Sequence, residues 1–363
     1  MANIKDYLYW RGDLTFEQCA FNEVDGVILS RLSYAPYELV IDELPQSFHT
    51  IGRTSEAMLS FPDIAKHVVL PEDVNLLKEI RKSNRFKDLK VLFCDSQLDV
   101  ESQTQFFGVT YKLSDELYYV VYRGTDNTLV GWKEDFNMGF VCPVPAQKLA
   151  DEYLERVAAE LEGSLIVGGH SKGGNLAVYA AAFCHDDIQP RIRTVYNFDG
   201  PGFDETVLTA PGYKRICDRV KTYVPQSSIG GMLLGHEEKY TIVHSTHTVM
   251  PLQHDTYTWD INRDRFVYLE TVTNSSKFLD STLKGWIAAL DVEQREKVVD
   301  TVYTVLKETN ALTLRELSEN WLATTRAIVK SIKNLDDETK KIVSEALRSL
   351  MKCARDALAK GNK

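Results

Sequence analysis

Residues Ile166–Ala177 read Ile-Val-Gly-Gly-His-Ser-Lys-Gly-Gly-Asn-Leu-Ala, so a β-type run, a glycine-rich turn and a helical run follow one another directly. The turn holds a G-x-S-x-G pattern, from Gly169 to Gly173. Glycines two residues before and after Ser171 remove side chains that would clash in a very tight strand-to-helix turn. The helix that follows points its free amides at the reacting centre. The pattern predicts that Ser171 is a nucleophile and that the amide of Lys172 donates to the oxyanion.

A glycine-rich turn between a strand and a helix can also be a plain connection or a phosphate-binding loop. The chain contains no G-x-x-x-x-G-K-[ST] spacing, which a P-loop requires. A plain connection therefore remains the alternative to a nucleophile turn.

Short apolar or alternating runs and helical segments alternate around this turn. This alternation predicts the α/β class, with a mainly parallel sheet covered by helices on both faces. Helical spacing is found at Asp151–Leu161 and Asn175–Phe183. The expected strands are Val91–Cys94, Thr104–Val109, Leu117–Tyr122, Leu165–Val167, Val195–Phe198, Val220–Val224 and Tyr240–Val243.

The texture of the sequence predicts three segments. Residues 1–84 are expected to form N-terminal elements packed on the core, partly helical at Val27–Leu32 and Ile64–Ile80. Residues 85–281 are expected to form the catalytic core. Residues 282–363 have helical periodicity and two stretches that resemble capping boxes, Asp291–Gln294 and Thr313–Glu316. Three or four helices are expected there, either as an appendage on the core or as a lid or partner-binding element.

Composition narrows the partners. The chain has 363 residues and a formal net charge of -10, with acidic residues spread along it, which argues against nucleic acid or an anionic membrane as the main partner. No signal peptide and no transmembrane run of about 18 apolar residues is visible. The six cysteines form no CxxC pair, so a cytoplasmic location is expected. The sequence leaves the oligomeric state open.

No metal-binding motif occurs in the sequence. HExxH, paired Cys/His clusters and EF-hand loops are absent, and the pair His244 and His247 alone makes a poor zinc site. We therefore expect neither a metal nor another cofactor.

Upstream of the serine, the run Tyr118–Tyr122 ends in Arg123-Gly124-Thr125. Catalytic groups of open α/β sheets collect at the carboxyl ends of the strands. The backbone amide of Thr125, with or without its hydroxyl, is thus a candidate second oxyanion donor.

This combination resembles the class 3, fungal-type lipase family over roughly residues 90–260. There an aromatic-Arg-Gly-Ser/Thr strand end is followed about ten residues on by Trp and then Asp. The resemblance implies a three-layer α/β-hydrolase fold and implies that Thr125 is the oxyanion residue, braced by Asp135. A solvated surface carboxylate is the alternative for Asp135. The rest of the chain resembles a bacterial lipase-like subfamily with little established biochemistry, in Asp6–Leu8, Asn22–Asp25, Val224–Ile229 and Leu252–Asp255.

A serine needs an imidazole to take its proton, and in α/β-hydrolases the chain order is serine, acid, histidine. His254 lies in Pro251–Trp259, beyond the last expected strand, and in class 3 lipases a Trp likewise follows the histidine by a few residues. His254 is therefore the expected base, with His236 or His247 as alternatives.

The acid departs from the family pattern. Class 3 lipases place it after the next-to-last core strand, but the matching turn here, Tyr223–Gly230, has no carboxylate. Pancreatic-type lipases carry the acid one strand earlier, which implies Asp199 in Tyr196–Gly202. The alternative is a turn-forming aspartate that caps its own backbone, and Asp204 and Asp218 are the other candidate acids.

The expected reaction is transfer of an acyl group from a small-molecule ester to water, without a cofactor. A thioesterase, peptidase or acyltransferase could use the same triad. A hydrolase-like scaffold that only binds remains a further alternative, favoured by the missing acid after the next-to-last strand.

Overall fold

The computed structural model describes residues 2–43, 49–126, 128–138, 141–228, 231, 234–248, 250–307 and 335–361. The chain divides into two compact units. The first comprises Met1–Gln97, Phe106–Gly124 and Ala146–Thr273, and the second comprises Leu98–Gln105, Thr125–Pro145 and Asn274–Lys363.

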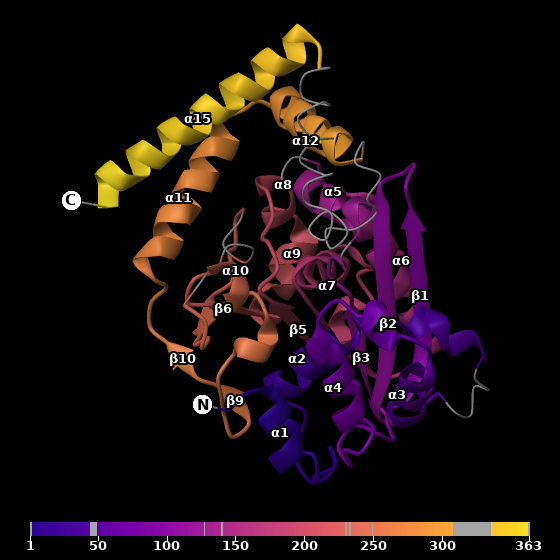
Figure 1. Ribbon diagram of the computed structural model, residues 1–363. Helices are drawn as coiled ribbons and strands as arrows, with labels where there is room; N and C mark the ends of the chain where they lie inside the picture. Colours follow the sequence, from indigo (N-terminus) through magenta and orange to yellow (C-terminus); the bar gives the residue numbers. More distant parts are fainter. Residues whose placement is uncertain are drawn as a thin grey trace. The chain divides into compact units, whose positions relative to one another are not determined.

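The main sheet has eight strands, in the order β1-β2-β3-β4-β5-β6-β7-β10. Figure 1 labels most of these strands. The strands from β3 to β7 pair in parallel, whereas β2 pairs antiparallel with β3 and β10 antiparallel with β7. The strands are β1 (Lys90–Asp99), β2 (Thr104–Ser114), β3 (Leu117–Tyr122), β4 (Ser164–His170), β5 (Ile192–Phe198), β6 (Val220–Pro225), β7 (Tyr240–Val243) and β10 (Tyr268–Leu269), and a separate hairpin joins β8 (Ile261–Asn262) to β9 (Arg265–Phe266).

Helices and short 3-10 segments precede β1 and link the later strands. The α-helices of the first unit are α1 (Ile4–Arg11), α2 (Glu23–Leu32), α3 (Ile51–Ser60), α4 (Pro71–Ile80), α6 (Pro145–Glu160), α7 (Lys172–Phe183), α8 (Glu205–Leu208), α9 (Pro211–Ile216) and α10 (Met250–Gln253). The 3-10 segments are η1 (Tyr37–Leu39), η2 (Ile41–Glu43), η4 (Ile64–Lys66), η5 (Gln189–Arg191), η6 (Cys217–Arg219) and η8 (Thr256–Thr258).

The side chains of β5 show that helices cover both faces of the sheet. Because side chains alternate along a strand, Tyr196 and Phe198 share one face and Asn197 points to the other. A Cβ added to Gly26 of α2 would lie 3.2 Å from Phe198, and one added to Gly174 of α7 would lie 2.2 Å from Asn197 Oδ1. The three layers and the mostly parallel sheet confirm the expected α/β-hydrolase fold class.

A buried polar cluster joins the N-terminal elements to one another. Asp25 of α2 and Arg85 form an ion pair of 2.6 Å whose side chains are both fully buried. The guanidinium of Arg85 also donates to the carbonyls of Cys19 and Ala20, at 2.9 and 3.0 Å. Tyr7 completes the cluster, since its hydroxyl donates to Asp25 at 3.0 Å. Every polar group that Arg85 meets here lies before it in the chain.

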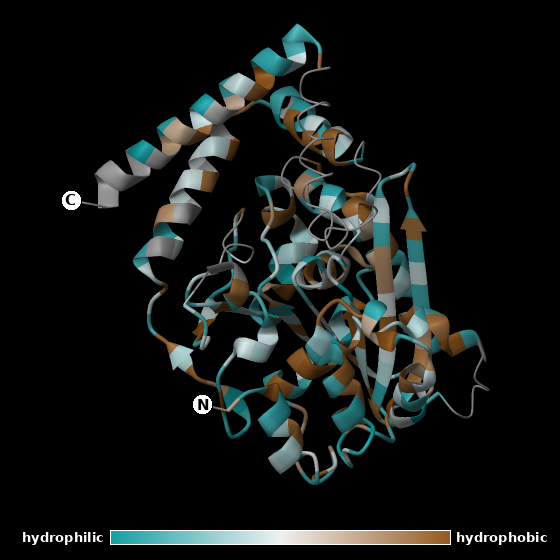
Figure 2. Ribbon diagram, viewed as in Figure 1, coloured by the Kyte–Doolittle hydropathy of each residue, from teal (hydrophilic) through white to brown (hydrophobic). Residues whose placement is uncertain are grey.

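The second unit contains α5 (Leu129–Asn137) from the middle of the chain. Its described C-terminal helices are α11 (Asn274–Ala289), α12 (Val292–Lys307) and α15 (Asp337–Gly361). α11 packs along α15, where the indole of Trp286 donates to the carbonyl of Ala346 at 2.8 Å. The coloured part of α15 carries both hydrophilic and hydrophobic residues (Figure 2).

Helical structure in the described part of 282–363 agrees with the expectation from periodicity. The expected capping box before α12 is confirmed, because Asp291 and Gln294 accept each other's backbone amides at 2.8 and 3.2 Å. Thr313–Glu316 lies outside the described residues. α11 spans the boundary that the sequence suggested between 281 and 282. Over the described ranges, no helix is long and apolar enough to cross a bilayer.

Candidate active site

Ser171 is the single residue between the end of β4 and the start of α7, and its backbone conformation is rare. Its φ and ψ are 58° and −133°, a combination that costs a non-glycine residue roughly 1–3 kcal/mol. Its side chain is partly exposed. The amide of Ser171 donates to the carbonyl of Phe198 at 2.9 Å, and the amide of Gly174 donates back to the Ser171 carbonyl at 2.9 Å. The strand-to-helix turn expected from the G-x-S-x-G pattern is therefore present.

The two glycines of the pattern are required by close approach. A Cβ added to Gly169 would lie 2.3 Å from the carbonyl carbon of Gly173, and one added to Gly173 would lie 2.1 Å from the carbonyl oxygen of Tyr122. Real side chains do not tolerate such distances, so α7 can begin this close to the sheet only because both positions lack a side chain. Lys172, the first residue of α7, is buried.

Asp199 follows β5 and is fully buried. Its φ is 55°, in the left-handed region that aspartate tolerates better than most residues. The carboxylate binds residues that are distant in the sequence. Its Oδ2 accepts a hydrogen bond from His254 Nδ1 at 2.6 Å. Its Oδ1 accepts from the amide of Gly231 at 3.2 Å and from the hydroxyl of Ser228. It thus does not cap its own turn, and three donors offset the cost of burying its charge.

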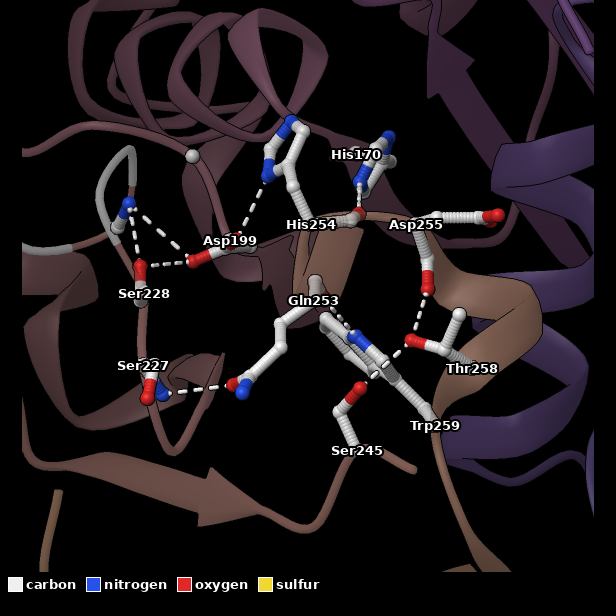
Figure 3. A network of polar contacts seen from close by, with 12 residues as sticks. His170, Asp199, Ser227, Ser228, Ser245, Gln253, His254, Asp255, Thr258 and Trp259 are labelled. Atoms are coloured by element: carbon white, nitrogen blue, oxygen red, sulfur yellow. Dashed lines mark hydrogen bonds and ion pairs between the residues drawn. The ribbon is translucent and has the colours of Figure 1, made fainter. Parts of the chain in front are cut away.

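His254 is the only one of these groups that is substantially exposed, with 37% of its side chain accessible. A carboxylate can only accept, so Nδ1 of His254 carries the proton and the neutral ring has its lone pair on Nε2. Figure 3 shows His254 directed at Asp199, with Ser228 on the other side of that carboxylate. A neutral imidazole in this tautomer is suited to accept a proton from a hydroxyl.

The segment around Ser171 contacts the segments of Asp199 and His254 directly. His170, which precedes Ser171, donates from Nε2 to the carbonyl of His254 at 2.9 Å, and the two rings lie 4.5 Å apart between centroids. A Cβ added to Gly200, which follows Asp199, would lie 2.4 Å from the carbonyl oxygen of Ser171. The structure therefore brings the expected serine, acid and histidine segments together.

The alternative histidines have other partners or surroundings. His236 is paired with Glu238 at 2.9 Å, and both side chains are nearly buried. Burial raises the pKa of Glu238, but the hydrogen bond and charge of His236, together with hydrogen bonds from the hydroxyls of Thr222 and Tyr213, lower it to about 2. His247 is exposed and its amide donates to Ser245 Oγ. Neither contact involves the residues around Ser171.

The alternative acids lie on the surface. Asp204 is exposed and caps the start of α8, accepting from the amides of Thr206 and Val207 at 3.0 and 3.2 Å. Asp218 is exposed in η6. Of the three candidate acids, Asp199 alone contacts a histidine that adjoins the Ser171 turn.

A third pair of this kind was not expected from the sequence. His244 contacts Asp260 through Nδ1 at 2.5 Å, and Asp260 is fully buried. The two residues lie at the end of β7 and just before β8. Carboxylate–histidine pairing by itself therefore does not identify a catalytic site in this chain.

The residues expected to complete the oxyanion site lie in the second unit. The hydroxyl of Thr125 donates to the carboxylate of Asp135, which is carried by α5. Asp135 is partly buried rather than a solvated surface residue. Because a hydroxyl has one proton, its bond to Asp135 occupies the donor of the Thr125 side chain. Gly124, which directly precedes Thr125, belongs to the first unit, and a Cβ there would lie 3.1 Å from Ser171 Cβ.

Sequence reasoning missed three residues around the site: Ser228, His170 and Tyr34. Ser228 lies in the turn where the resemblance to class 3 lipases implies an acid, so its place in the sequence already pointed to the site. His170 lies inside the G-x-S-x-G pattern, at its variable second position. Tyr34 had no local signal, because its partner is 136 residues away. Among the described residues, no group of three or more His, Cys, Asp or Glu side chains could hold a metal ion.

Comparison with known proteins gives one family and distant structural neighbours. The model of the Mbeg1-like family matches residues 80–304. The crystal structure of M37 lipase is 13% identical over 59% of this chain and 71% of that chain, with a TM-score of 0.38. A fungal lipase–inhibitor complex is 16% identical over 61% of this chain and 79% of that chain, with a TM-score of 0.37. No curated protein matches the chain significantly.

Proposed function

This chain belongs to the Mbeg1-like family, and from the geometry around Ser171 we propose that it is a serine hydrolase of carboxylic esters. One observation carries the proposal. The buried carboxylate of Asp199 accepts the Nδ1 proton of His254 at 2.6 Å, while His170, next to Ser171, binds the backbone of His254. A serine on a strained bend with a paired imidazole beside its segment is the arrangement that acyl transfer requires.

The proposed reaction has two steps. Ser171 Oγ attacks the ester carbonyl while His254 Nε2 takes its proton, and the same proton is then given to the leaving alcohol. Water next attacks the acyl-serine, loses its proton to His254, and the carboxylic acid leaves as Ser171 regains its proton. Asp199 holds the imidazole tautomer and stabilises the imidazolium that forms in each step.

Two backbone amides are proposed to stabilise the oxyanion. The amide of Lys172 is the first of α7, where the helix dipole favours negative charge. The amide of Thr125 is the second donor, since the hydroxyl of Thr125 is bound to Asp135. Each such donor typically contributes on the order of 3 kcal/mol to transition-state stabilisation.

The proposed substrate is a small acyl ester, and no cofactor takes part. Thioesters, amides and acyl acceptors other than water would use the same triad. Hydrolysis of p-nitrophenyl esters of increasing chain length, compared with matched thioesters and anilides, separates these substrate classes.

The test compares the wild-type protein with Ser171→Ala, and with Ser60→Ala as a control because Ser60 is exposed on α3. We expect ester hydrolysis and labelling by a fluorophosphonate probe in the wild type and in Ser60→Ala, and loss of both in Ser171→Ala. His254→Ala should also abolish labelling, while His247→Ala should not. Equal hydrolysis and equal labelling by the wild type and Ser171→Ala would contradict the proposal and favour a protein that only binds.

A further inference from the structure

The buried side chain of His170 holds the backbone of His254, and the buried side chain of Tyr34 in turn contacts His170. We propose that His170 and Tyr34 are positioning residues for the His254 imidazole. The inference rests on the proposed hydrolase function, because it concerns the same base. His254 stands on a short link between α10 and η8, and its ring is partly exposed. Such a ring needs fixed neighbours, since misplacement by about 1 Å can lower a rate on the order of 10²-fold.

His170 holds His254 in two ways. Its Nε2 donates to the His254 carbonyl at 2.9 Å, and its ring lies against the His254 ring with centroids 4.5 Å apart. Figure 3 shows His170 beside the backbone of His254, while the His254 ring turns toward Asp199. Because His170 directly precedes Ser171, the His170 side chain links the backbone of His254 to the turn that carries Ser171.

Tyr34 fixes the tautomer of His170. A carbonyl oxygen only accepts, so the hydrogen bond to His254 requires a proton on Nε2 of His170. Burial, followed by the charges of His254 and Arg31, holds the pKa of His170 well below its usual value, so the ring is neutral and Nδ1 is an acceptor. The hydroxyl of Tyr34 lies 3.1 Å from Nδ1 and 3.3 Å from the backbone carbonyl oxygen of His170, so its one proton is shared between these two acceptors. Without this donor, the neutral ring has less reason to keep its proton on Nε2.

A buried ion pair contacts both Tyr34 and the segment that follows His254. Arg31 of α2 binds Asp73 of α4 through two bonds of 2.7 and 2.6 Å, with both side chains about 97% buried, since 3% of each is exposed. The guanidinium lies 4.4 Å from the ring of Tyr34 and 5.6 Å from that of Tyr257. The hydroxyl of Tyr257, three residues after His254, donates to Asp73 at 2.9 Å. The N-terminal helices therefore hold Tyr34 and the His254 segment through the same charged pair.

Four variants test the proposal. His170→Met removes the donor to His254, whereas His170→Gln keeps an N–H group near the position of Nε2. Tyr34→Phe removes only the hydroxyl. His185→Gln is the control, because His185 is exposed and pairs with Glu155 away from this network. We expect kcat for ester hydrolysis to fall about 10- to 100-fold in His170→Met and a few-fold in Tyr34→Phe, with KM little changed.

The conservative variant separates positioning from general stability. His170→Gln should recover most of the kcat that His170→Met loses, and fluorophosphonate labelling rates should follow the same order. Labelling at the wild-type rate in folded His170→Met would overturn the proposal. If His170→Met does not fold, Tyr34→Phe decides: a wild-type labelling rate and wild-type kcat in that variant would overturn it as well.

A second readout keeps this inference distinct from the proposed activity. The proton shared by His254 and Asp199 should give a downfield NMR signal in the wild type and in Ser171→Ala, whether or not esters are cleaved. We expect the signal to persist in His170→Gln and to broaden or vanish in His170→Met. The expected NMR pattern without any ester hydrolysis would contradict the proposed function alone. An unchanged signal in folded His170→Met would contradict the positioning role alone.

Discussion

The hydroxyl of Ser228, in the turn after β6, donates a hydrogen bond to the carboxylate of Asp199, which follows β5. Ser228 thus occupies the place where the resemblance to class 3 lipases implies an acid, and it binds the acid candidate of the neighbouring strand. The same hydroxyl accepts from the amide of Gly231 at 3.0 Å, so it links the turn to the carboxylate. The carboxylate of Asp199, which follows β5, therefore binds His254 while Ser228, in the turn after β6, donates a hydrogen bond to that carboxylate.

Ser228→Ala should weaken this support. The buried carboxylate of Asp199 loses one of its donors, which we expect to lower the free energy of unfolding by about 1–3 kcal/mol and kcat by about tenfold. Ser227→Ala is the matched control, because the hydroxyl of Ser227 contacts Thr273 at 2.7 Å and not Asp199. Urea denaturation and p-nitrophenyl ester kinetics measure both effects. Equal kcat values for the two variants would contradict the role given to Ser228.

Asp199→Asn should preserve the fold and abolish most activity. An amide in place of the carboxylate can donate to Nδ1 of His254, which favours the wrong tautomer, and kcat is expected to fall on the order of 10³- to 10⁴-fold. Asp204→Asn provides the comparison, since Asp204 is an exposed helix cap and its loss should affect stability only slightly. A small and equal loss of kcat in both variants would exclude Asp199 as the acid.

The buried neutral His170 should make stability depend on pH. Burial, more than the nearby charges of His254 and Arg31, depresses its pKa, so below about pH 6.5 the unfolded chain binds a proton that the folded chain does not. The free energy of unfolding should therefore decrease as the pH falls from about 7 to about 5, by at most about 1.4 kcal/mol per pH unit from this group.

His170→Gln removes that titrating group and should flatten the dependence, as denaturant unfolding at several pH values would show. Asp151, whose pKa burial raises to about 6, has the opposite sign but is present in both proteins. It therefore cancels in the difference. Identical pH slopes for the wild type and His170→Gln would show that His170 is not buried in its neutral form.

Gly173→Ala should destabilise the protein strongly, because the added Cβ would meet the Tyr122 carbonyl oxygen at 2.1 Å. We expect a loss above about 3 kcal/mol or failure to fold. Gly285→Ala in α11 is the contrasting case, since its nearest neighbour would be Cys353 Sγ at 3.6 Å. Ala is favoured over Gly inside a helix, so stability should rise by about 0.5–1 kcal/mol. Thermal unfolding distinguishes the two outcomes.

Asp135→Ala should reduce kcat without a comparable change in KM. The Thr125 hydroxyl loses its acceptor, and the proposed oxyanion amide beside it becomes less fixed. The expected loss is about tenfold, below the roughly 10²- to 10³-fold cost of removing an oxyanion donor outright. Asp337→Asn, an exposed residue of α15, should behave like the wild type. A KM increase without loss of kcat would instead indicate a role of Asp135 in substrate binding.

Local patterning predicted most of the sheet. Tyr240–Val243 has the bounds expected from its β-type run, whereas β4 continues through Gly168 and Gly169, which the sequence suggested were already in the turn. Glycine weakens a strand in isolation, but both residues pair with neighbouring strands, Gly168 with Tyr196 and Gly169 with Tyr122. Pairing with the neighbouring strands therefore extends β4 beyond Val167, where the local sequence predicted its end.

The geometry of the candidate site was predictable where its signal was local. The sharp turn at Ser171 was readable from the glycines around it, because their spacing reflects the clash they avoid. Asp199 depended on a resemblance, and its geometry is set by partners 29 to 55 residues away. The contact of Tyr34 with His170 spans 136 residues, so no window of sequence contains both. The short hairpin of β8 and β9 has only two residues in each strand, too few for periodicity to be visible.

The Arg85 cluster sets a limit on how this chain can be shortened. Arg85 lies inside the range that the family model matches, yet its carboxylate partner and the carbonyls it binds all precede residue 80. A protein that begins at residue 80 would leave the guanidinium of Arg85 buried without its partners. Loss of one partner of a buried ion pair lowers the free energy of unfolding by about 3–5 kcal/mol. The range matched by the family model therefore leaves out the polar partners of Arg85, and truncation at residue 80 should destabilise the remaining chain.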